Sequence, residues 1–238
     1  RINKKIGYVG TLHSFLFRQL KKQCMNLVLL PEDDAIDLLK RLAKQINLWT
    51  KSTKKLSELR RTWSSRERKG ESLDRGEDRL RSLFLSNMQA MECVDYDGIL
   101  DYGLSGIESG MICGEVKHLL VDEFQDSSDL DVEIYQSMPC KTRFYVGDPR
   151  QAIYGFRGGN VENMYEYVDH SGFDIHELNE NYRSVEEICS FSNSVADSAF
   201  QPMSSAIGNS DSAIMVLPME DEMEELHFIA NKTKHYLE

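Results

Sequence analysis

Hydrophobic residues along the chain form short continuous runs in some places and helical repeats in others. The short runs predict β-strands at residues 6–10, 119–121, 142–146, 175–178 and 213–217. Apolar residues spaced three or four apart predict helices at residues 31–49, 53–63, 72–91, 127–138, 184–196 and 220–236. Thr11 or Ser14 can cap one more helix, and Ser127 or Ser128 can cap the helix that ends near residue 138. The mixture of strands and helices predicts an α/β fold.

Several finer expectations follow from the same pattern. Residues 64–70 are polar and residues 103–114 are rich in Gly and Ser, so both stretches are expected to be loops. Ser184 and Glu187 have the spacing of a capping box. In the last helix we expect four residues to face inward: Met223, Leu226, Ile229 and Ala230.

Composition and charge narrow the class of protein. Hydrophobic residues make up 41% and charged residues 28%, no apolar run approaches membrane-spanning length, and no secretory signal is visible. The five cysteines are scattered and form no CxxC pair, which argues against a zinc site or a disulfide framework. We therefore expect a cytoplasmic protein, near the nucleoid if bacterial, with no membrane partner.

The charge is unevenly distributed. Residues 40–81 contain fourteen Lys or Arg and six Asp or Glu, a local net charge of +8, although the whole chain carries −11. A basic block in an acidic chain is a candidate nucleic-acid footprint. A solvated helical face explains it equally well.

The most informative stretch is the predicted strand at residues 119–121 and the acids that follow it. A short Leu and Val run is typical of a strand buried on both faces. Asp122, Glu123 and Asp126 then lie where the strand leaves the sheet, the edge at which open α/β sheets bind ligands. Two adjacent carboxylates there can hold Mg²⁺ and orient a water, which is the chemistry of nucleotide hydrolysis. Alternatively, Asp122 or Asp126 only caps the next helix.

Two other groups of residues suggest contacts to nucleic acid or phosphate. Tyr154, Phe156 and Arg157 lie among three glycines and could stack on bases, or pin a loop to the core. Tyr182 and Arg183 lie at a strand-to-helix joint and could stack on a purine and bind a phosphate, or be a packed Tyr and an ion-paired Arg.

Three segments in order, LLVDEFQDSS, VGDPRQAIYGFRGG and LNENYRS, resemble motifs II, III and IV of the UvrD/Rep branch of superfamily 1 DNA helicases. GTLHSF is similar to a family segment that contacts single-stranded DNA, with Leu12 in place of the usual Phe, and DYDGIL resembles the segment before motif II. The resemblance covers roughly residues 7–194. The GDPxQAIY motif also occurs in RecB/AddA-like helicase–nucleases, so the subgroup of the family to which the chain is similar stays open.

The resemblance implies roles at an ATP site. Asp122 would hold Mg²⁺, and Glu123, itself a further candidate ligand of the metal, would orient the attacking water. Gln151 would sense the γ-phosphate, Arg183 would contact that phosphate, and Tyr182 would stack on adenine. The implied cofactors are ATP and Mg²⁺.

The resemblance also implies contacts to single-stranded DNA and duplex junctions. Tyr154 and Phe156, where the family often has Trp, would stack on bases. Arg157, Thr11 and His13 would touch the same strand. The expected function is ATP-dependent DNA translocation, by family analogy from 3′ to 5′.

The expected architecture is a RecA-like parallel sheet flanked by helices. Residues 1–30 and 93–198 would belong to the first RecA-like motor domain, residues 31–92 to an inserted helical, basic subdomain, and residues 199–238 to the start of a second motor domain. The chain has no GxxxxGK[ST] loop, and the family's upstream glutamine motif and motifs V and VI are also absent. We therefore expect a middle fragment that hydrolyses no ATP by itself. The alternatives are a non-catalytic DNA-binding or protein-docking scaffold and part of a helicase–nuclease.

Overall fold

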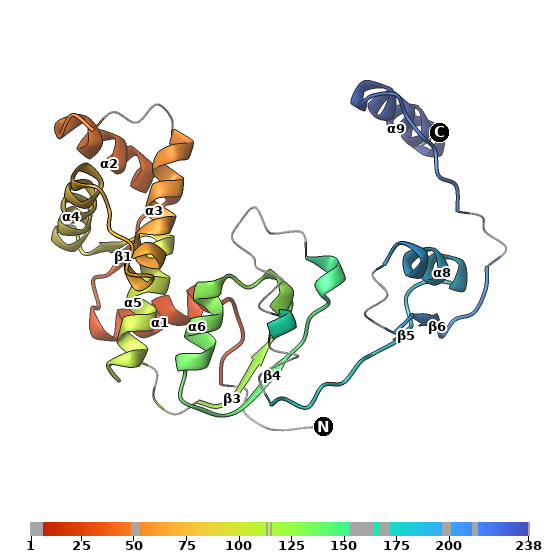
Figure 1. Ribbon diagram of the computed structural model, residues 1–238, viewed down its shortest axis with the longest axis horizontal. Coiled ribbons are helices and arrows are strands. Elements are labelled where there is room, and N and C mark those ends of the chain that lie inside the picture. The colour runs from red at the N-terminus through yellow and green to blue at the C-terminus, as the bar shows by residue number, and fades with distance from the viewer. Residues whose placement is uncertain are drawn as a thin grey trace. The chain divides into compact units, whose positions relative to one another are not determined.

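The computed structural model (Figure 1) describes residues 7–48, 53–112, 114, 116–152, 164–166, 172–196, 201–210 and 214–237. The chain divides into two compact units, Arg1–Gly172 and Phe173–Glu238. Helices surround small parallel strand pairs, so the fold is α/β. The finer division expected above, with limits at residues 30, 92 and 198, stays a prediction. Among the described residues, no helix is both long and apolar enough to cross a membrane.

A three-helix layer forms one part of the first unit. It consists of α2 (Glu32–Gln45), α3 (Thr53–Arg68) and α4 (Arg75–Ala90). Their apolar faces meet in one core that includes Leu39, Leu56, Trp63, Leu80 and Phe84. Acids in the first turn of α2 and an Asp74 capping box on α4 stabilise the two helix starts.

The helix α3 is longer than predicted, because residues 64–68 continue it rather than form a loop. Side-chain bonds hold this polar stretch in place. Arg66 donates to Glu77 at 3.0 Å, and Arg68 pairs with Glu133 at 3.1 Å. Polarity alone therefore misplaced the end of the helix.

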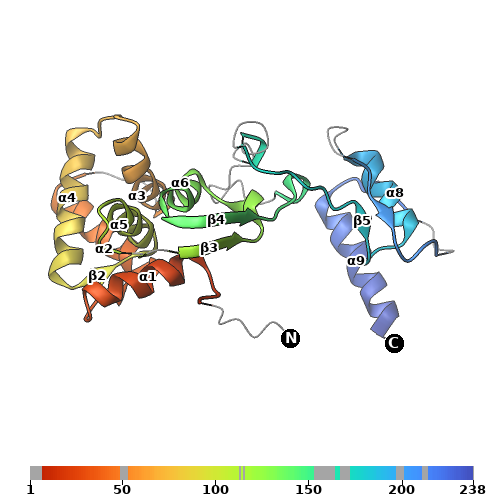
Figure 2. The same cartoon turned by 90° about the horizontal axis from the view of Figure 1, so that it is seen from below.

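A second core joins α1 (Leu12–Gln23), α5 (Tyr96–Glu108) and α6 (Asp129–Ser137). The short parallel pair β1 (Val28–Leu29) and β2 (Cys93–Val94) adds residues to the same core. Figure 2 shows these helices beside the longer pair, β3 (Val116–Val121) and β4 (Cys140–Tyr145). Of the two cap candidates predicted for each helix, Thr11 caps α1 and Ser128 caps α6.

The expected loop at residues 103–114 is wrong in its first half, because α5 runs through residue 108, whereas residues 109–112 form turns and bends as expected. Within α5, Gly103 serves close packing rather than a turn. A Cβ at Gly103 would lie 2.7 Å from Cδ1 of Leu16, a fully buried side chain of α1. Glycine thus allows α1 and α5 to approach closely.

The prediction that the strand at residues 119–121 is buried on both faces is also wrong. Residues alternate along β3 and β4, and Leu120 and Phe144 are 71% and 59% exposed. Leu119, Val121 and Tyr145 pack inward against the helices. Among the described residues, nothing covers the other face of this pair.

The predicted strand at residues 6–10 is not formed in its described part, because residues 7–10 are irregular. A strand needs a hydrogen-bonded neighbour, and within the described ranges none pairs with this segment. The same reason applies to residues 175–178 and 214–217, which are irregular instead of the expected strands. In the second unit the parallel pair is β5 (Glu180–Asn181) and β6 (Ser204–Ser205).

Two helices complete the second unit, α8 (Glu186–Val195) and α9 (Glu222–Leu237). The expected Ser184–Glu187 capping box is wrong: Val185 is the N-cap, and Glu187 accepts the N–H of Ser210 instead. The inward face expected for α9 is also wrong, since none of its residues is buried. No described part of the unit packs against that face.

A buried ion pair fastens the three-helix layer to the start of α5. The guanidinium of Arg60 in α3 donates two hydrogen bonds to the Asp95 carboxylate, both at 2.7 Å. Asp95 also caps α5 by accepting the N–H of Gly98. Trp63 and Phe84 flank the guanidinium, whose carbon lies 5.3 and 5.6 Å from their ring centroids. Burial lowers the pKa of Arg60, but the bonds and charge of Asp95 outweigh it and raise that pKa.

A second carboxylate, close to this Arg60–Asp95 pair, makes stability depend on pH. Burial raises the pKa of Asp97 from the usual 3.8 to about 6, partly offset by the charge of Arg60. The folded state therefore holds the proton more tightly, and this contribution to stability is lost as pH rises from about 4 through about 6. We expect Asp97→Asn to raise the free energy of unfolding at pH 7.5 by about 1–2 kcal/mol, and to change it little at pH 4.

Urea denaturation at the two pH values measures this effect. Asp78→Asn, at an exposed site in α4, is the control and should change stability by less than about 0.5 kcal/mol at either pH. Equal effects of Asp97→Asn at both pH values would show that titration of Asp97 is not the cause.

Candidate functional site

The carboxyl ends of β3 and β4 lie side by side. The strands are parallel with Val121 opposite Tyr145, and the N–H of Phe124 donates to the carbonyl of Val146 at 2.9 Å. The residues that follow the two strands are therefore held at one edge. That edge is where a parallel sheet presents ligand-binding groups.

Glu123 turns the chain sharply at this edge. Its backbone is left-handed, with φ 53° and ψ 44°, a conformation unfavourable for a residue with a side chain. Strained residues of this kind concentrate at functional sites. Both Asp122 and Glu123 are exposed, and Oδ1 of Asp122 accepts the N–H of Glu123 at 3.1 Å.

The alternative role of these acids as helix caps is excluded for α6. Ser128 is its N-cap and forms a capping box with Asp131. Asp122 and Asp126 therefore do not serve that purpose.

A chain of hydrogen bonds connects Glu123 with the loop after β4. The side-chain amide of Gln125 donates to Oε2 of Glu123 at 2.7 Å and accepts the N–H of Asp148 at 3.1 Å. The carboxylate of Asp148 then accepts from the amide of Gln151 at 3.0 Å and from Arg150. Burial raises the pKa of Asp148, but these bonds from Arg150 and Gln151 outweigh it and lower that pKa. The structure thus links the predicted residues Glu123 and Gln151 through two residues that carried no predicted role.

The donor set at this edge suits a hard cation. Asp122 and Glu123 offer carboxylate oxygens, the ligands that Mg²⁺ prefers. Oδ1 of Asp126 is buried and has no hydrogen-bond partner among the described residues. Desolvation, and then the charge of Glu123, raise the pKa of Asp126. In the described part of the chain, no group of three or more His, Cys, Asp or Glu forms a complete metal site, so Mg²⁺ would need oxygens from water or phosphate as well.

The predicted DNA contacts Thr11 and His13 lie at the start of α1. Thr11 is exposed, and its side chain accepts the N–H of Ser14. The His13 ring lies 5.8 Å from the ring of Tyr96, the exposed first residue of α5. Burial lowers the pKa of His13, opposed by the charge of Asp131. Near neutral pH this His is therefore an uncharged ring suited to stacking or hydrogen bonding.

The predicted DNA-stacking residues Tyr154 and Phe156, together with Arg157, lie outside the described residues. Their roles stay predictions.

Tyr182 and Arg183 lie in the second unit, just after β5. The side chain of Asn181 accepts the N–H groups of Arg183 and Ser184, each at 2.8 Å, which fixes a tight turn. Tyr182 is 72% exposed and its hydroxyl donates to Glu180. Arg183 is exposed and forms no ion pair with another described residue. The two side chains are therefore accessible, as ligand-binding groups need to be.

A family model, the UvrD/REP helicase N-terminal domain, matches residues 5–171. The chain belongs to the UvrD/REP helicase family. Its curated relatives include DNA helicase II of Escherichia coli, 26% identical over 95% of this chain and 35% of that protein. An ATP-dependent helicase/nuclease of Oenococcus oeni is 32% identical over 48% of this chain, and the helicase srs2 of Schizosaccharomyces pombe is 30% identical over 46%. These matches span 10% and 13% of those two relatives. The chain thus spans about a third of the length of DNA helicase II.

Ion pairs within this UvrD/REP chain neutralise much of the basic block. Seven of its basic residues pair with carboxylates, namely Lys40, Lys54, Arg60, Arg61, Arg66, Arg68 and Arg81. Apart from Arg60, which is buried, these residues are at least partly exposed and fit the interpretation of a solvated, ion-paired surface. Five others have no ion pair with a described residue and could still meet phosphates: Arg41, Lys44, Lys69, Arg75 and Arg79.

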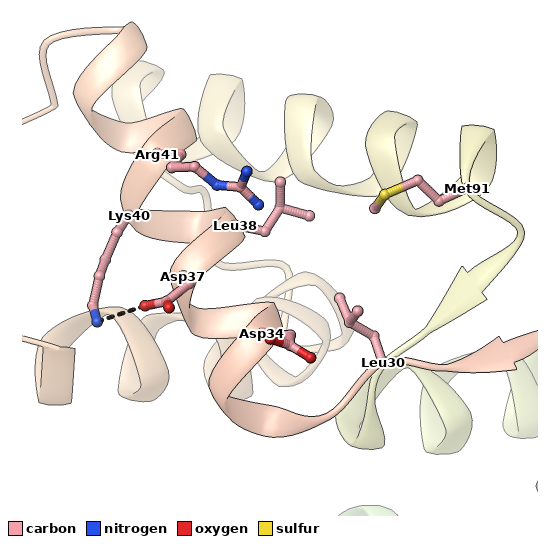
Figure 3. Close-up of a pocket in the computed structure, with 7 residues that line it drawn as sticks. All are labelled: Leu30, Asp34, Asp37, Leu38, Lys40, Arg41 and Met91. Carbon is pink, nitrogen blue, oxygen red and sulfur yellow. Dashed lines mark hydrogen bonds and ion pairs between the residues drawn. The ribbon is translucent and has the colours of Figure 1, made fainter.

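A hollow of about 490 Å³ lies beside α2 (Figure 3). Leu30, Leu38 and Met91 form its apolar part, and Asp37 pairs with Lys40 at its rim. Lys40 and Arg41 of the basic block line it, but none of the described residues predicted to bind ATP does. It is therefore separate from the candidate ATP site at the strand ends.

Sequence reasoning assigned no role to Gln125 or Asp148. Gln125 lies between the two acids Glu123 and Asp126 in the DEFQD segment, and Asp148 follows Gly147 at the end of the next strand. These positions beside predicted site residues were the indication in the sequence that Gln125 and Asp148 could belong to the site. Their partnership depends on the register between β3 and β4, which no local pattern reveals.

Proposed function

We propose that the chain is the central part of an ATP-dependent DNA helicase that couples ATP hydrolysis to movement on single-stranded DNA. The observation that carries this proposal is the hydrogen-bonded path from Glu123 through Gln125 and Asp148 to Gln151. It joins a candidate base to a candidate phosphate sensor at one sheet edge. Hydrolysis of a phosphoanhydride depends mainly on positioning and charge neutralisation, which such an edge supplies.

In this proposal the first unit belongs to a RecA-like motor domain interrupted by a helical insertion. The separate core of α2, α3 and α4 supports the insertion. The parallel pair β3–β4 with helices packed on one face supports the RecA-like layer.

Asp122 would hold the metal ion and Glu123 would orient the water that attacks the γ-phosphate. Mg²⁺, when bound, would neutralise charge on the phosphate oxygens. Gln151 would sense the γ-phosphate, while Tyr182 and Arg183 would contact adenine and phosphate from the second unit. Thr11 and His13 would bind the DNA backbone or bases, together with Tyr154, Phe156 and Arg157.

The test of this function needs a longer protein that contains this chain and a phosphate-binding loop. We expect single-stranded DNA to stimulate its ATP turnover and ATP to drive strand separation. A longer protein that binds DNA but turns over no ATP under any condition would instead support the scaffold alternative.

For the 238-residue chain by itself we expect no measurable ATP turnover and weak, sequence-neutral DNA binding. Because five basic residues of the block have no ion pair with a described residue, three to five phosphate contacts are expected, and the slope of log affinity against log salt should be about −2 to −4. Fluorescence anisotropy with a labelled oligonucleotide at several salt concentrations measures this slope. Binding that is independent of salt would contradict an electrostatic footprint.

The relative from Oenococcus oeni favours a second candidate, because its name describes a helicase/nuclease. In that case the longer protein would also cut DNA. A nuclease assay on the longer protein, with and without ATP, distinguishes the two.

A further inference from the structure

The side chain of Gln125 is fully enclosed between two functional segments. It is 2% exposed, yet it lies in the short turn that directly follows β3 and Glu123. Its amide spans from Oε2 of Glu123, 2.7 Å away, to the backbone nitrogen of Asp148, 3.1 Å away. One side chain therefore contacts both strand ends.

The polarity of these two contacts fixes the orientation of the amide. Its NH₂ group faces a carboxylate, and its carbonyl faces an N–H donor. The reversed amide would put oxygen against oxygen and nitrogen against nitrogen, losing both bonds in a buried place. Gln125 thus has one stable arrangement as long as both segments hold their positions.

The absence of a side chain at Gly147 lets the backbone of the next loop approach Gln125 closely. A Cβ there would lie 2.6 Å from Oε1 of Gln125 and 3.1 Å from the backbone nitrogen of Phe124. The loop after β4 therefore lies directly against the turn after β3. A shift of one segment has to move the other through contacts that are already tight.

The path continues beyond Asp148. Its carboxylate holds the side chains of both Arg150 and Gln151 in the 3₁₀ turn Pro149–Gln151. That turn leads directly into the stretch with Tyr154 and Phe156. A displacement on the DNA side of the loop would thus reach Glu123 through Asp148 and Gln125.

We propose that Gln125 is a positioning residue that couples Glu123 to the loop at residues 147–151, so that DNA engagement sets the placement of the catalytic carboxylate. This inference rests on the proposed helicase function. It adds that the amide of Gln125 holds the segments after β3 and β4 in fixed positions relative to each other.

Two variants separate the hydrogen bond that Gln125 donates to Glu123 from the one that it accepts from Asp148. Gln125→Glu keeps an acceptor for the N–H of Asp148 but replaces the donor to Glu123 with a like-charged group. Gln125→Met keeps the size of the side chain and removes both hydrogen bonds. Gln89→Met, at an exposed site near the end of α4, is the matched control.

In the longer protein with a phosphate-binding loop, we expect both variants of Gln125 to lower kcat for ATP in the presence of single-stranded DNA by about 10- to 100-fold. The KM for ATP should change by less than about threefold. The ratio of turnover with DNA to turnover without DNA should fall as well, because the coupling is lost. The Gln89 control should match the wild type in all three quantities.

Hydrogen exchange in the 238-residue chain provides a readout that needs no activity. The backbone amide of Asp148 should stay protected in Gln125→Glu and lose protection in Gln125→Met. If Gln125→Met fails to fold, the kinetics of Gln125→Glu still decide the question.

These measurements distinguish a failure of the proposed role of Gln125 from a failure of the proposed helicase function. A wild-type protein whose ATP turnover does not respond to DNA would refute the proposed function. A wild type that responds, with Gln125 variants that keep the same DNA stimulation, would overturn only the role of Gln125. A parallel loss of kcat and ATP affinity would indicate general damage to the site, and would also overturn that role.

Discussion

Replacing Arg60 with Met is expected to lower the free energy of unfolding by about 3–5 kcal/mol. Asp95 is 5% exposed, and its carboxylate receives both of its charged hydrogen bonds from this guanidinium. Without Arg60, a buried charge would keep only the hydrogen bond from the N–H of Gly98. The aromatic packing of Trp63 and Phe84 against the guanidinium is lost as well.

The neighbouring residue provides a matched control. Arg61 pairs with Glu32 at 3.5 Å, and both side chains are at least half exposed. Arg61→Met should therefore change stability by no more than about 1 kcal/mol. Urea denaturation of the two variants compares a buried and an exposed pair one residue apart in the sequence.

A double variant tests whether the buried charge is the cause. Arg60→Met combined with Asp95→Asn removes the unpaired charge and keeps an acceptor for the Gly98 N–H. We expect it to be more stable than Arg60→Met alone, a coupling that additive contributions cannot produce. Similar stability losses for Arg60→Met and Arg61→Met would contradict the importance of burial.

Glu123→Gln in a longer protein with a phosphate-binding loop is expected to lower DNA-stimulated ATP turnover by about 10²- to 10⁴-fold. The substitution preserves shape, and an amide oxygen at position 123 can still accept from Gln125. It removes the negative charge that would orient and activate the attacking water. Nucleotide affinity should stay within a few-fold of the wild type, because the phosphate-binding groups lie elsewhere.

Steady-state turnover with a nucleotide-binding measurement checks this result. Glu108→Gln, at an exposed site near the end of α5, changes the net charge equally and should leave turnover unchanged. Full turnover by Glu123→Gln would show that another residue activates the water, and Asp126 would be tested next.

The sequence predicted best the features that depend on local periodicity. The helices at α2, α4, α6 and α9 and the strands β3 and β4 were found close to their observed bounds. The family was also evident from the strand-end motifs, because DEFQD followed by GDPRQAIYGFRGG resembles the UvrD/Rep helicases. Helix caps such as Thr11 and Ser128 follow from a single residue and were predicted correctly.

The errors share one physical origin, because they concern contacts between distant parts of the chain. Glycines at residues 103–114 suggested a loop, although Gly103 serves the close approach of α1. Exposed Leu120 and Leu226 have the pattern of core residues, which cannot show whether another element covers them. Similarly, no local pattern pairs Gln125 with Asp148, 23 residues apart.

The left-handed backbone of Glu123 creates a conflict between ease of folding and chemistry. A glycine there would adopt φ 53° without penalty, but it would also leave the buried amide of Gln125 without its acceptor, which costs about 1–3 kcal/mol and outweighs the relief of backbone strain. The same change would remove the carboxylate on which the proposed hydrolysis depends. A search for thermostable variants is therefore expected to accept Gly at this position only together with an apolar replacement of Gln125, and an activity screen run alongside it would reject every such clone.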